Sequence, residues 1–270
     1  MNVENKIAVI TGGAGGIGSA LCEALAAKGA KVVVSDLDLD AATVVAEKIS
    51  GVALKCDARD ESSIKQLVTN VESQHGPIDL FCSNAGFGVG EPSHAASASN
   101  DIWQKIWELH VMAHVWASRA LLPSMIERGD GYLLNVASAA GLLLQVGDAA
   151  YSATKHAAVS FAESLAVSHG HQGIKVSVVC PQYVNTNILG VSEQDRRQKL
   201  QGVITPEECA DSIVLGIEQE SFMILPHTEV TDFYQNRAAD PERWINSMQR
   251  FRSKVLDDEG KVDFRKIFGL

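Results

Sequence analysis

The sequence lacks the features that mark membrane, secreted and nucleic-acid-binding proteins. It contains no apolar run close to the roughly 18 residues that span a bilayer. It begins MNVENK and passes directly into a short apolar run, unlike a secretory signal peptide. Acidic residues outnumber basic ones, 33 to 23, and the net charge of −10 argues against general binding to a phosphate backbone. We therefore expect a cytoplasmic protein that binds neither nucleic acid nor membranes.

Cysteine is scarce and scattered, which argues against metal clusters and redox motifs. The five cysteines form no CxxC pair, and three of them stand at the ends of apolar runs, where a reduced thiol behaves as a small hydrophobe. They are Cys22, Cys56, Cys82, Cys180 and Cys209. The only metal-like spacing is that of His110 and His114, four residues apart, with no acidic third ligand evident beside it. We expect no metal site.

No linker, repeat or block of charge divides the 270 residues, so we read the chain (1–270) as a single domain. Short apolar runs alternate with helix-patterned segments, which is typical of a parallel sheet covered by helices on both faces. The predicted strands are 6–11, 31–36, 52–56, 78–83, 131–137, 174–180 and 222–225. This order predicts a doubly wound α/β fold of the Rossmann type, in which ligands bind beyond the carboxyl ends of the strands.

Two segments near the C-terminus lie outside this alternation. Residues 187–205 begin apolar and become charged, which predicts a mobile helical flap over the site. Residues 241–270 begin with Pro241 and an amphipathic helix and end in the tail DDEGKVDFRKIFGL. The sequence is compatible with three roles for this tail: a disordered segment, a lid over the site, or a contact between subunits.

The N-terminal motif predicts a dinucleotide site. The run KIAVIT is followed by glycines at 12, 13, 15, 16 and 18, and a helical pattern extends from Ile17 to Lys28. A glycine turn before a helix N-terminus lets the backbone approach a pyrophosphate, which the helix dipole favours. The next strand ends in Asp36, where a carboxylate accepts from a ribose 2′-hydroxyl and repels a 2′-phosphate. Because Leu37 rather than a basic residue follows, the sequence favours NAD over NADP.

A second motif predicts a proton-transfer centre. Tyr151 and Lys155, in the run YSATK, are four residues apart and share one face of a helix, with Cβ atoms about 5–6 Å apart. Only about 0.1% of a free phenol is ionised at neutral pH. A lysine cation within roughly 4–6 Å favours the phenolate, as general acid–base catalysis requires. Ser138, in NVASAAG, precedes the pair and completes the group.

Together these motifs resemble the short-chain dehydrogenase/reductase family in its compact single-domain form. The resemblance extends over nearly the whole chain, through TGGAGGIG, Asp36, CDARD, Asn84-Ala85-Gly86, Ser138, Tyr151 with Lys155, and Pro181 to Thr186. It implies an NAD(P)-dependent oxidoreductase that acts on an alcohol or ketone. In this family Tyr151 would be the acid/base and Ser138 would orient the substrate oxygen. Lys155 would lower the tyrosine pKa and hold the nicotinamide ribose.

The resemblance also implies the cofactor-binding residues and the assembly. Asp57 would contact the adenine, the Asn84-Ala85-Gly86 turn would line the cleft, and Thr186 would meet the nicotinamide carboxamide. The full predicted set is Gly12, Gly15, Gly16, Ile17, Gly18, Asp36, Leu37, Asp57, Ala58, Asn84, Ala85, Gly86, Tyr151, Lys155, Pro181, Val184 and Thr186. Helices at 100–128 and 151–169 would form the contacts of a homodimer or homotetramer.

His110 is the clearest departure from the family pattern, because the position seven after Trp103 usually holds an asparagine, the fourth member of the catalytic group. In relatives a water beside the lysine is held there by the main-chain carbonyl of a locally distorted helix. Three roles are open for His110: it maintains that distortion, it relays protons with a pKa near ~6.5, or it only packs. We expect the backbone role to survive and include His110 in the catalytic group.

The residues around the predicted site indicate a mainly apolar alcohol or ketone with one or two polar handles, although plain packing also explains them. They are Leu142, Leu143, Leu144, Gln145, Gln182, Tyr183, Asn187, Ile188 and Leu189. Two other functions remain open. A catalytically silent dinucleotide-binding regulatory protein is disfavoured by the intact Ser138, Tyr151 and Lys155. A sugar-nucleotide epimerase or dehydratase is disfavoured because roughly 45 residues follow the last predicted strand, too few for its substrate domain.

Overall fold

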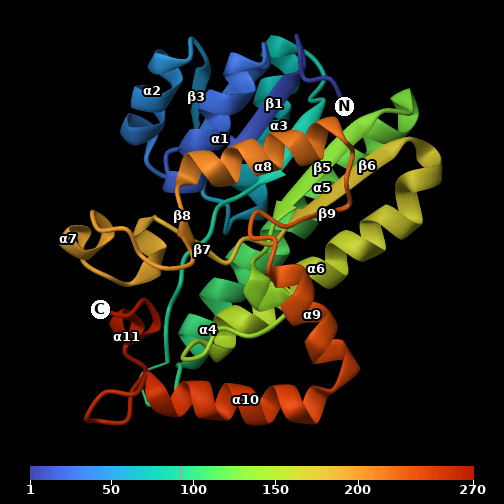
Figure 1. Cartoon of the computed structure of the whole chain (residues 1–270). Coiled ribbons are helices and arrows are strands. Elements are labelled where there is room, and N and C mark those ends of the chain that lie inside the picture. The colour runs from blue at the N-terminus through green and yellow to red at the C-terminus, as the bar shows by residue number, and fades with distance from the viewer. Residues whose placement is uncertain (92) are drawn as a thin grey trace.

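The computed structural model describes residues 1–91 and 93–270 as an α/β fold in three layers. The middle layer is a seven-stranded parallel sheet of order β3-β2-β1-β4-β5-β6-β9 (Figure 1). Its strands are β1 (Ile7–Thr11), β2 (Lys31–Asp36), β3 (Val52–Lys55), β4 (Leu80–Ser83), β5 (Gly131–Val136), β6 (Ile174–Val179) and β9 (Met223–Ile224). They coincide with the seven predicted runs, so the predicted doubly wound fold is confirmed. The strand order reverses between β1 and β4, where such sheets open a crevice for ligands.

Buried apolar side chains explain why these runs form the sheet. β1, β4 and β5 are buried along their whole length, as expected for strands that are covered on both faces. Successive side chains point to opposite faces, so each strand contributes to two cores. In β1, for example, Val9 belongs to one apolar cluster and Ile10 to the other.

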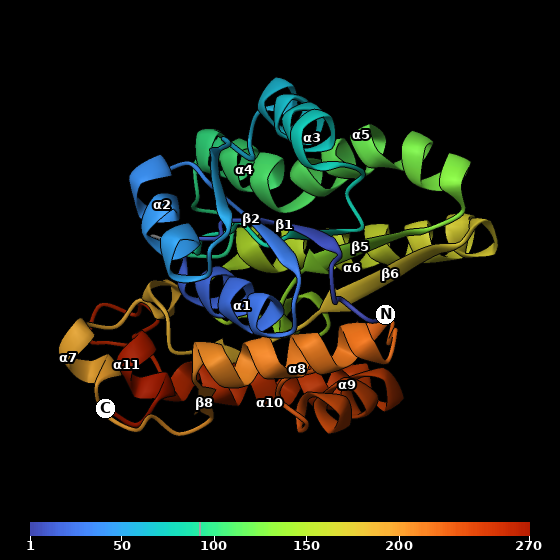
Figure 2. The same ribbon diagram turned by 90° about the horizontal axis from the view of Figure 1, so that it is seen from above.

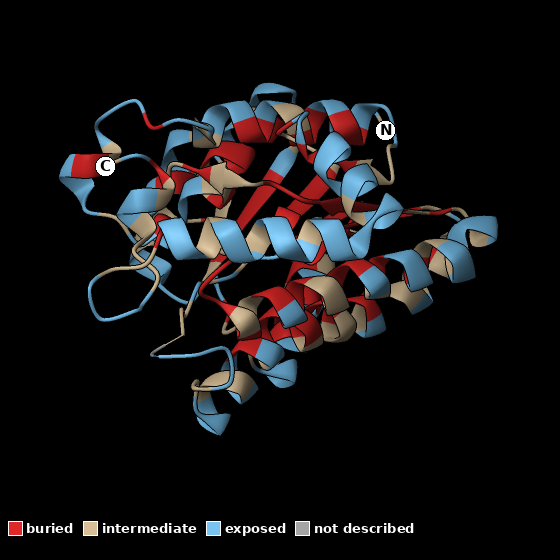
Figure 3. Ribbon diagram, turned by 60° about the horizontal axis from the view of Figure 1, so that its bottom comes forward, coloured by how far each residue is buried: buried red, intermediate tan, exposed pale blue. Residues whose placement is uncertain are grey.

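Helices cover both faces of the sheet (Figure 2). One face carries α1 (Gly16–Ala27), α2 (Leu39–Lys48) and α8 (Pro206–Glu218). The other carries α3 (Glu61–His75), α4 (Asn100–Trp107), α5 (Ala113–Arg128) and α6 (Ala149–His169), with the short turns η2 (Ala139–Gly141) and η3 (Gly170–Gln172) flanking α6. The strands are buried between these layers (Figure 3). Among the described residues, no helix is both long and apolar enough to cross a membrane.

The predicted helix at 100–128 contains a local distortion. α4 leads directly into η1 (Glu108–Met112), a π-helical turn, and then into α5. A π turn inserts one extra residue into the hydrogen-bond ladder of a helix and is frequent at functional sites. His110 stands at the centre of this turn and is fully buried.

The C-terminal part is more irregular. The segment 187–205, predicted as a helical flap, contains η4 (Asn187–Leu189), α7 (Glu193–Arg196) and β8 (Val203–Ile204), which pairs with β7 (Tyr183–Val184). After β9 come α9 (Val230–Ala239), which the sequence pattern did not predict, and then α10 (Pro241–Lys254) and α11 (Phe264–Ile267). Phe268 is buried against Leu189 and Leu200. The tail therefore packs on the flap segment 187–205.

Candidate active site

Glycines place the N-terminus of α1 at the crevice. α1 begins at Gly16, and its N-cap Gly15 has no side chain to cap the first N–H groups. Gly12 has a φ of +63°, and a Cβ atom there would lie 2.8 Å from the Cα of Ala85. At Gly18 a Cβ atom would lie 2.1 Å from the carbonyl oxygen of Gly12. Larger residues would force this loop apart, so the glycines preserve a helix N-terminus that can bind an anion.

The carboxylate of Asp36 is fixed at the end of β2. One oxygen accepts from the Ala14 N–H at 3.0 Å and the other from the Asp38 N–H at 3.2 Å. Asp38 and Asp40 line the adjoining surface together with a single cation, Lys55. This surface carries more negative than positive charge, which disfavours an additional phosphate group.

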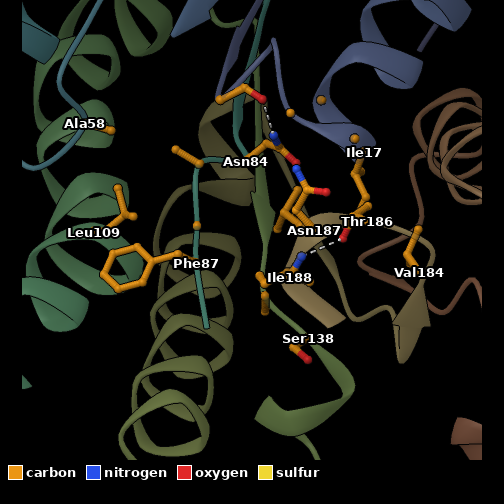
Figure 4. A pocket seen from close by; sticks show the side chains of 18 of the residues that line it. Ile17, Ala58, Asn84, Phe87, Leu109, Ser138, Val184, Thr186, Asn187 and Ile188 are labelled. Atoms are coloured by element: carbon orange, nitrogen blue, oxygen red, sulfur yellow. Dashed lines mark hydrogen bonds between the residues drawn. The ribbon is translucent and has the colours of Figure 1, made fainter. Parts of the chain in front are cut away.

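A cleft of about 580 Å³ joins the glycine loop to the helix α6, which carries Tyr151 and Lys155. All the predicted cofactor-binding residues line it, as does Ser138. Ala58, Phe87 and Leu109 are on one side, Ile17, Val184 and Thr186 on the other, and Ser138 lies at one end (Figure 4). The sequence did not single out the lining residues Cys56, Arg59, Phe87, Leu109, Val136 and Ala137. Arg59 forms an ion pair with Asp57 at 3.2 Å, a contact between neighbours in the CDARD motif.

The structure brings together Ser138, Tyr151 and Lys155. Ser138 follows β5, and its hydroxyl accepts from the Ala140 N–H at 3.0 Å. The Lys155 ammonium lies 5.5 Å from the centre of the Tyr151 ring and donates to the Val136 carbonyl at 3.0 Å. The spacing in YSATK thus places phenol and ammonium side by side against the end of β5.

Burial controls the ionisation of this group. Burial raises the pKa of Tyr151 to about 12, and hydrogen bonding from Ser138 opposes this effect. Burial also lowers the pKa of Lys155 to about 8. The resemblance implied a lowered tyrosine pKa, but in the chain by itself desolvation of the phenolate dominates.

Asp148 caps α6 and was not anticipated from the sequence. It is the N-cap of α6, and its Oδ1 accepts from the Tyr151 N–H at 3.1 Å. Its Oδ2 accepts from the N–H groups of Val89 at 3.0 Å and Gly90 at 2.8 Å. A single carboxylate therefore joins the loop after β4 to the start of α6. An acid three residues before Tyr151 is a helix-capping signal that could have revealed it.

His110 lies behind the cleft and connects three elements. Its Nδ1 is 3.1 Å from the Thr154 hydroxyl, which itself donates to the Tyr151 carbonyl at 2.9 Å. The Phe87 N–H donates to Nε2 at 3.2 Å. Nδ1 must therefore carry the proton, and the ring is neutral. Burial and, secondarily, the Lys155 charge lower the His110 pKa well below 6.5. The geometry fits a positioning role better than a titrating relay.

Residues 6–197 match the sequence model of a family described as short chain dehydrogenase. The chain belongs to this family. It is 36% identical over 237 residues to 1-deoxy-11-beta-hydroxypentalenate dehydrogenase of Streptomyces exfoliatus, covering 85% of this chain and 86% of the relative. Meso-2,3-butanediol dehydrogenase of Serratia marcescens is 32% identical over 219 residues, covering 78% and 86%. The NAD complex of a short-chain dehydrogenase/reductase from Burkholderia phymatum has a TM-score of 0.81 at 25% identity, covering 90% and 96%.

His227, a further buried histidine of this short-chain dehydrogenase, was not assigned a role from the sequence. His227 accepts from the Gln182 N–H at 3.1 Å through Nδ1, and its Nε2 contacts the Tyr183 carbonyl at 3.1 Å. These two contacts stabilise the turn that follows β6. No local pattern could have revealed this contact, because 45 residues separate His227 from Gln182.

His114, four residues after His110, is buried. Neither of its ring nitrogens has a hydrogen-bond partner among the described residues, and burial lowers its pKa to about 3. No cluster of three His, Cys, Asp or Glu side chains suited to a metal occurs in ranges 1–91 and 93–270. The five cysteines are free and buried.

Proposed function

We propose that this oxidoreductase is NAD-dependent and interconverts a secondary alcohol and a ketone of largely apolar character. The observation that carries the proposal is the convergence of Ser138, Tyr151 and Lys155 at the end of a cleft that begins at a glycine-capped helix N-terminus. The relatives named for a hydroxypentalenate and a butanediol support hydroxyl chemistry.

The proposed mechanism assigns one task to each side chain. In alcohol oxidation Tyr151 accepts the hydroxyl proton while Ser138 hydrogen-bonds the same oxygen. Bound NAD would accept the hydride from the carbinol carbon, and its positive ring would favour the phenolate. Lys155, held by the Val136 carbonyl, would bind the ribose and stabilise the phenolate. In ketone reduction Tyr151, whose raised pKa keeps the phenol protonated at neutral pH, would donate the proton to the substrate oxygen.

The activity can be tested with a panel of aliphatic, aromatic and steroid-like secondary alcohols, each with NAD, by following NADH absorbance. Turnover of at least one alcohol is expected. If every alcohol failed while NADH still bound, the alternative of a catalytically silent dinucleotide-binding protein would be supported. An epimerase or dehydratase would instead convert a sugar nucleotide without net reduction of NAD.

We expect NAD to be preferred over NADP by at least ~10-fold in kcat/KM, or about 1.4 kcal/mol. Asp36 and its acidic neighbours Asp38 and Asp40 would repel a 2′-phosphate. The solved neighbour in complex with NAD supports this choice. Asp36→Ala should relax the preference by removing a fixed carboxylate, whereas Asp232→Ala on α9 should leave it unchanged. Equal kcat/KM values for both cofactors in the wild type would contradict the assignment.

We infer that His110 positions Tyr151 rather than relaying protons. His110→Asn can retain part of the contacts to Phe87 and Thr154 and should keep at least a tenth of the activity. His110→Ala leaves those groups unpaired, at a cost of about 1–3 kcal/mol, and should lose more. Any ionisation near pH 6–7 in the wild-type pH–rate profile should persist in His110→Asn. Its disappearance in that variant would identify His110 as the relay group.

We also propose that the protein is cytoplasmic and forms a homodimer or homotetramer through α4, α5 and α6. Val167 on α6 is 84% exposed and Trp107 at the end of α4 is 41% exposed, which supports a contact there. Reduced, buried cysteines agree with a reducing compartment. Sedimentation equilibrium would measure the mass in solution, and a monomer would overturn the proposed assembly.

A further inference from the structure

A second cavity adjoins the catalytic end of the cleft. It has a volume of about 240 Å³ and is bordered by Ser138 and Tyr151. Phe264 and Phe268, from the C-terminal tail, also line it. The tail therefore supplies a wall of the space into which a substrate of Tyr151 must fit. Residues beyond 197 lie outside the range matched by the family model.

Aromatic and apolar contacts hold the tail against the flap. The Phe268 ring is 5% exposed and meets the Tyr183 ring edge-on, with centroids 5.0 Å apart. Leu189 and Leu200 complete a small apolar cluster around Phe268. Figures 1 and 2 both show α11 beside α7. The buried cluster fixes the position of Phe268 and, through the short helix, that of Phe264.

An ion pair and a close apolar contact hold the tail at two other points. The Arg265 guanidinium lies 3.5 Å from the Asp195 carboxylate of α7. On the other side, Val262 packs against Gly147, where a Cβ atom would lie 2.8 Å from the Val262 Cβ. Gly147 directly precedes Asp148, the N-cap of the catalytic helix. The tail thus contacts both the flap and the segment that leads to Tyr151.

The lining of the cavity is suited to a neutral, compact molecule. Ile188, Leu189 and the two phenylalanines provide apolar surface, while Gln145 and Tyr183 offer polar groups. Asp148 is the only charged side chain among the described lining residues, and it already accepts from three N–H groups. The volume is below the roughly 300–1,000 Å³ of pockets that hold drug-sized ligands.

We propose that the segment Val255–Leu270 determines substrate size, with Phe264 as the residue that selects a compact, uncharged alcohol or ketone over one with a long chain. This inference rests on the proposed function and makes its substrate class specific. A cavity of about 240 Å³ between Tyr151 and the tail has room for a single-ring ketone. A ketone with a long unbranched alkyl chain would have to displace Phe264 or separate the flap from the tail.

The test compares cyclohexanone with 2-decanone in wild type, Phe264→Ala and the control Phe233→Ala, whose side chain is 43% exposed on α9. Turnover with NADH and binding to the enzyme–NADH complex by calorimetry are both measured. Phe264→Ala should raise the preference for 2-decanone relative to cyclohexanone by at least ~10-fold, the scale of a cavity change of a few methylenes. Phe233→Ala should leave it unchanged.

The two readouts separate this inference from the proposed function. If neither ketone is reduced but binding shows the expected shift in preference, the proposed reaction is wrong and the proposed selection of substrate size by Phe264 is supported. If the wild type reduces ketones and Phe264→Ala leaves the preference unchanged, Phe264 does not select substrate size. Failure of both ketones to bind the wild-type complex would also overturn the inference.

Discussion

Tyr151→Phe should lower turnover by at least the 10²–10⁴ typical of a general acid/base while NADH affinity stays nearly constant. The substitution keeps the ring, which packs edge-on against His110 with centroids 5.4 Å apart. It deletes the hydroxyl that would exchange the substrate proton. Steady-state kinetics on an alcohol found in the panel would measure the loss, and fluorescence titration with NADH would measure cofactor binding.

Tyr234→Phe provides the matched control, because Tyr234 is 40% exposed on α9 and does not line the cleft or the cavity. Its turnover should equal that of the wild type. Near-full turnover in Tyr151→Phe would show that another group transfers the proton. Comparable losses in both variants would point to a general defect in folding.

Lys155→Met should reduce both turnover and NADH affinity, because the ammonium is assigned two tasks. The side chain is buried, and its Nζ donates to the Val136 carbonyl at 3.0 Å. Methionine approximates the apolar stem but removes the charge. Hydrogen bonds to charged groups contribute about 1.5–3 kcal/mol, so a loss of roughly 10–100-fold in affinity is expected. Turnover should fall further, since the phenolate also loses its cation.

Lys175→Met is the control for this prediction. Lys175 lies on the strand β6, away from the cleft, and forms surface ion pairs with Asp130 and Glu220. Its replacement should change neither turnover nor NADH affinity. Thermal unfolding of each variant would distinguish a local loss from a destabilised fold. Unchanged NADH affinity in a folded Lys155→Met would remove the ribose-binding role.

The sequence predicted the sheet, and the residues that it singled out for cofactor binding line one cleft, because both depend on local signals. A strand that is covered on both faces must be apolar throughout, so β1 and β5 appear as continuous apolar runs. The glycine loop is constrained by close approaches, such as that of Gly18 to the Gly12 carbonyl. The four-residue spacing of Tyr151 and Lys155 is set by helix geometry alone.

What the sequence could not predict depends on contacts between distant residues. The packing of Phe268 on Tyr183 joins positions far apart in the chain and leaves no periodic pattern. The bonds of His227 to the turn after β6 are of the same kind. His110 is intermediate: its departure from the family pattern was visible, but choosing among three roles required its partners Phe87 and Thr154.

The most direct test of the central claim is hydride transfer from an alcohol deuterated at its carbinol carbon. Wild-type enzyme, NAD and the labelled alcohol should yield NADH that carries one deuterium by mass spectrometry, together with the ketone. Tyr151→Phe should form this product far more slowly. NADH formed without deuterium would contradict the proposed transfer from the carbinol carbon to the cofactor.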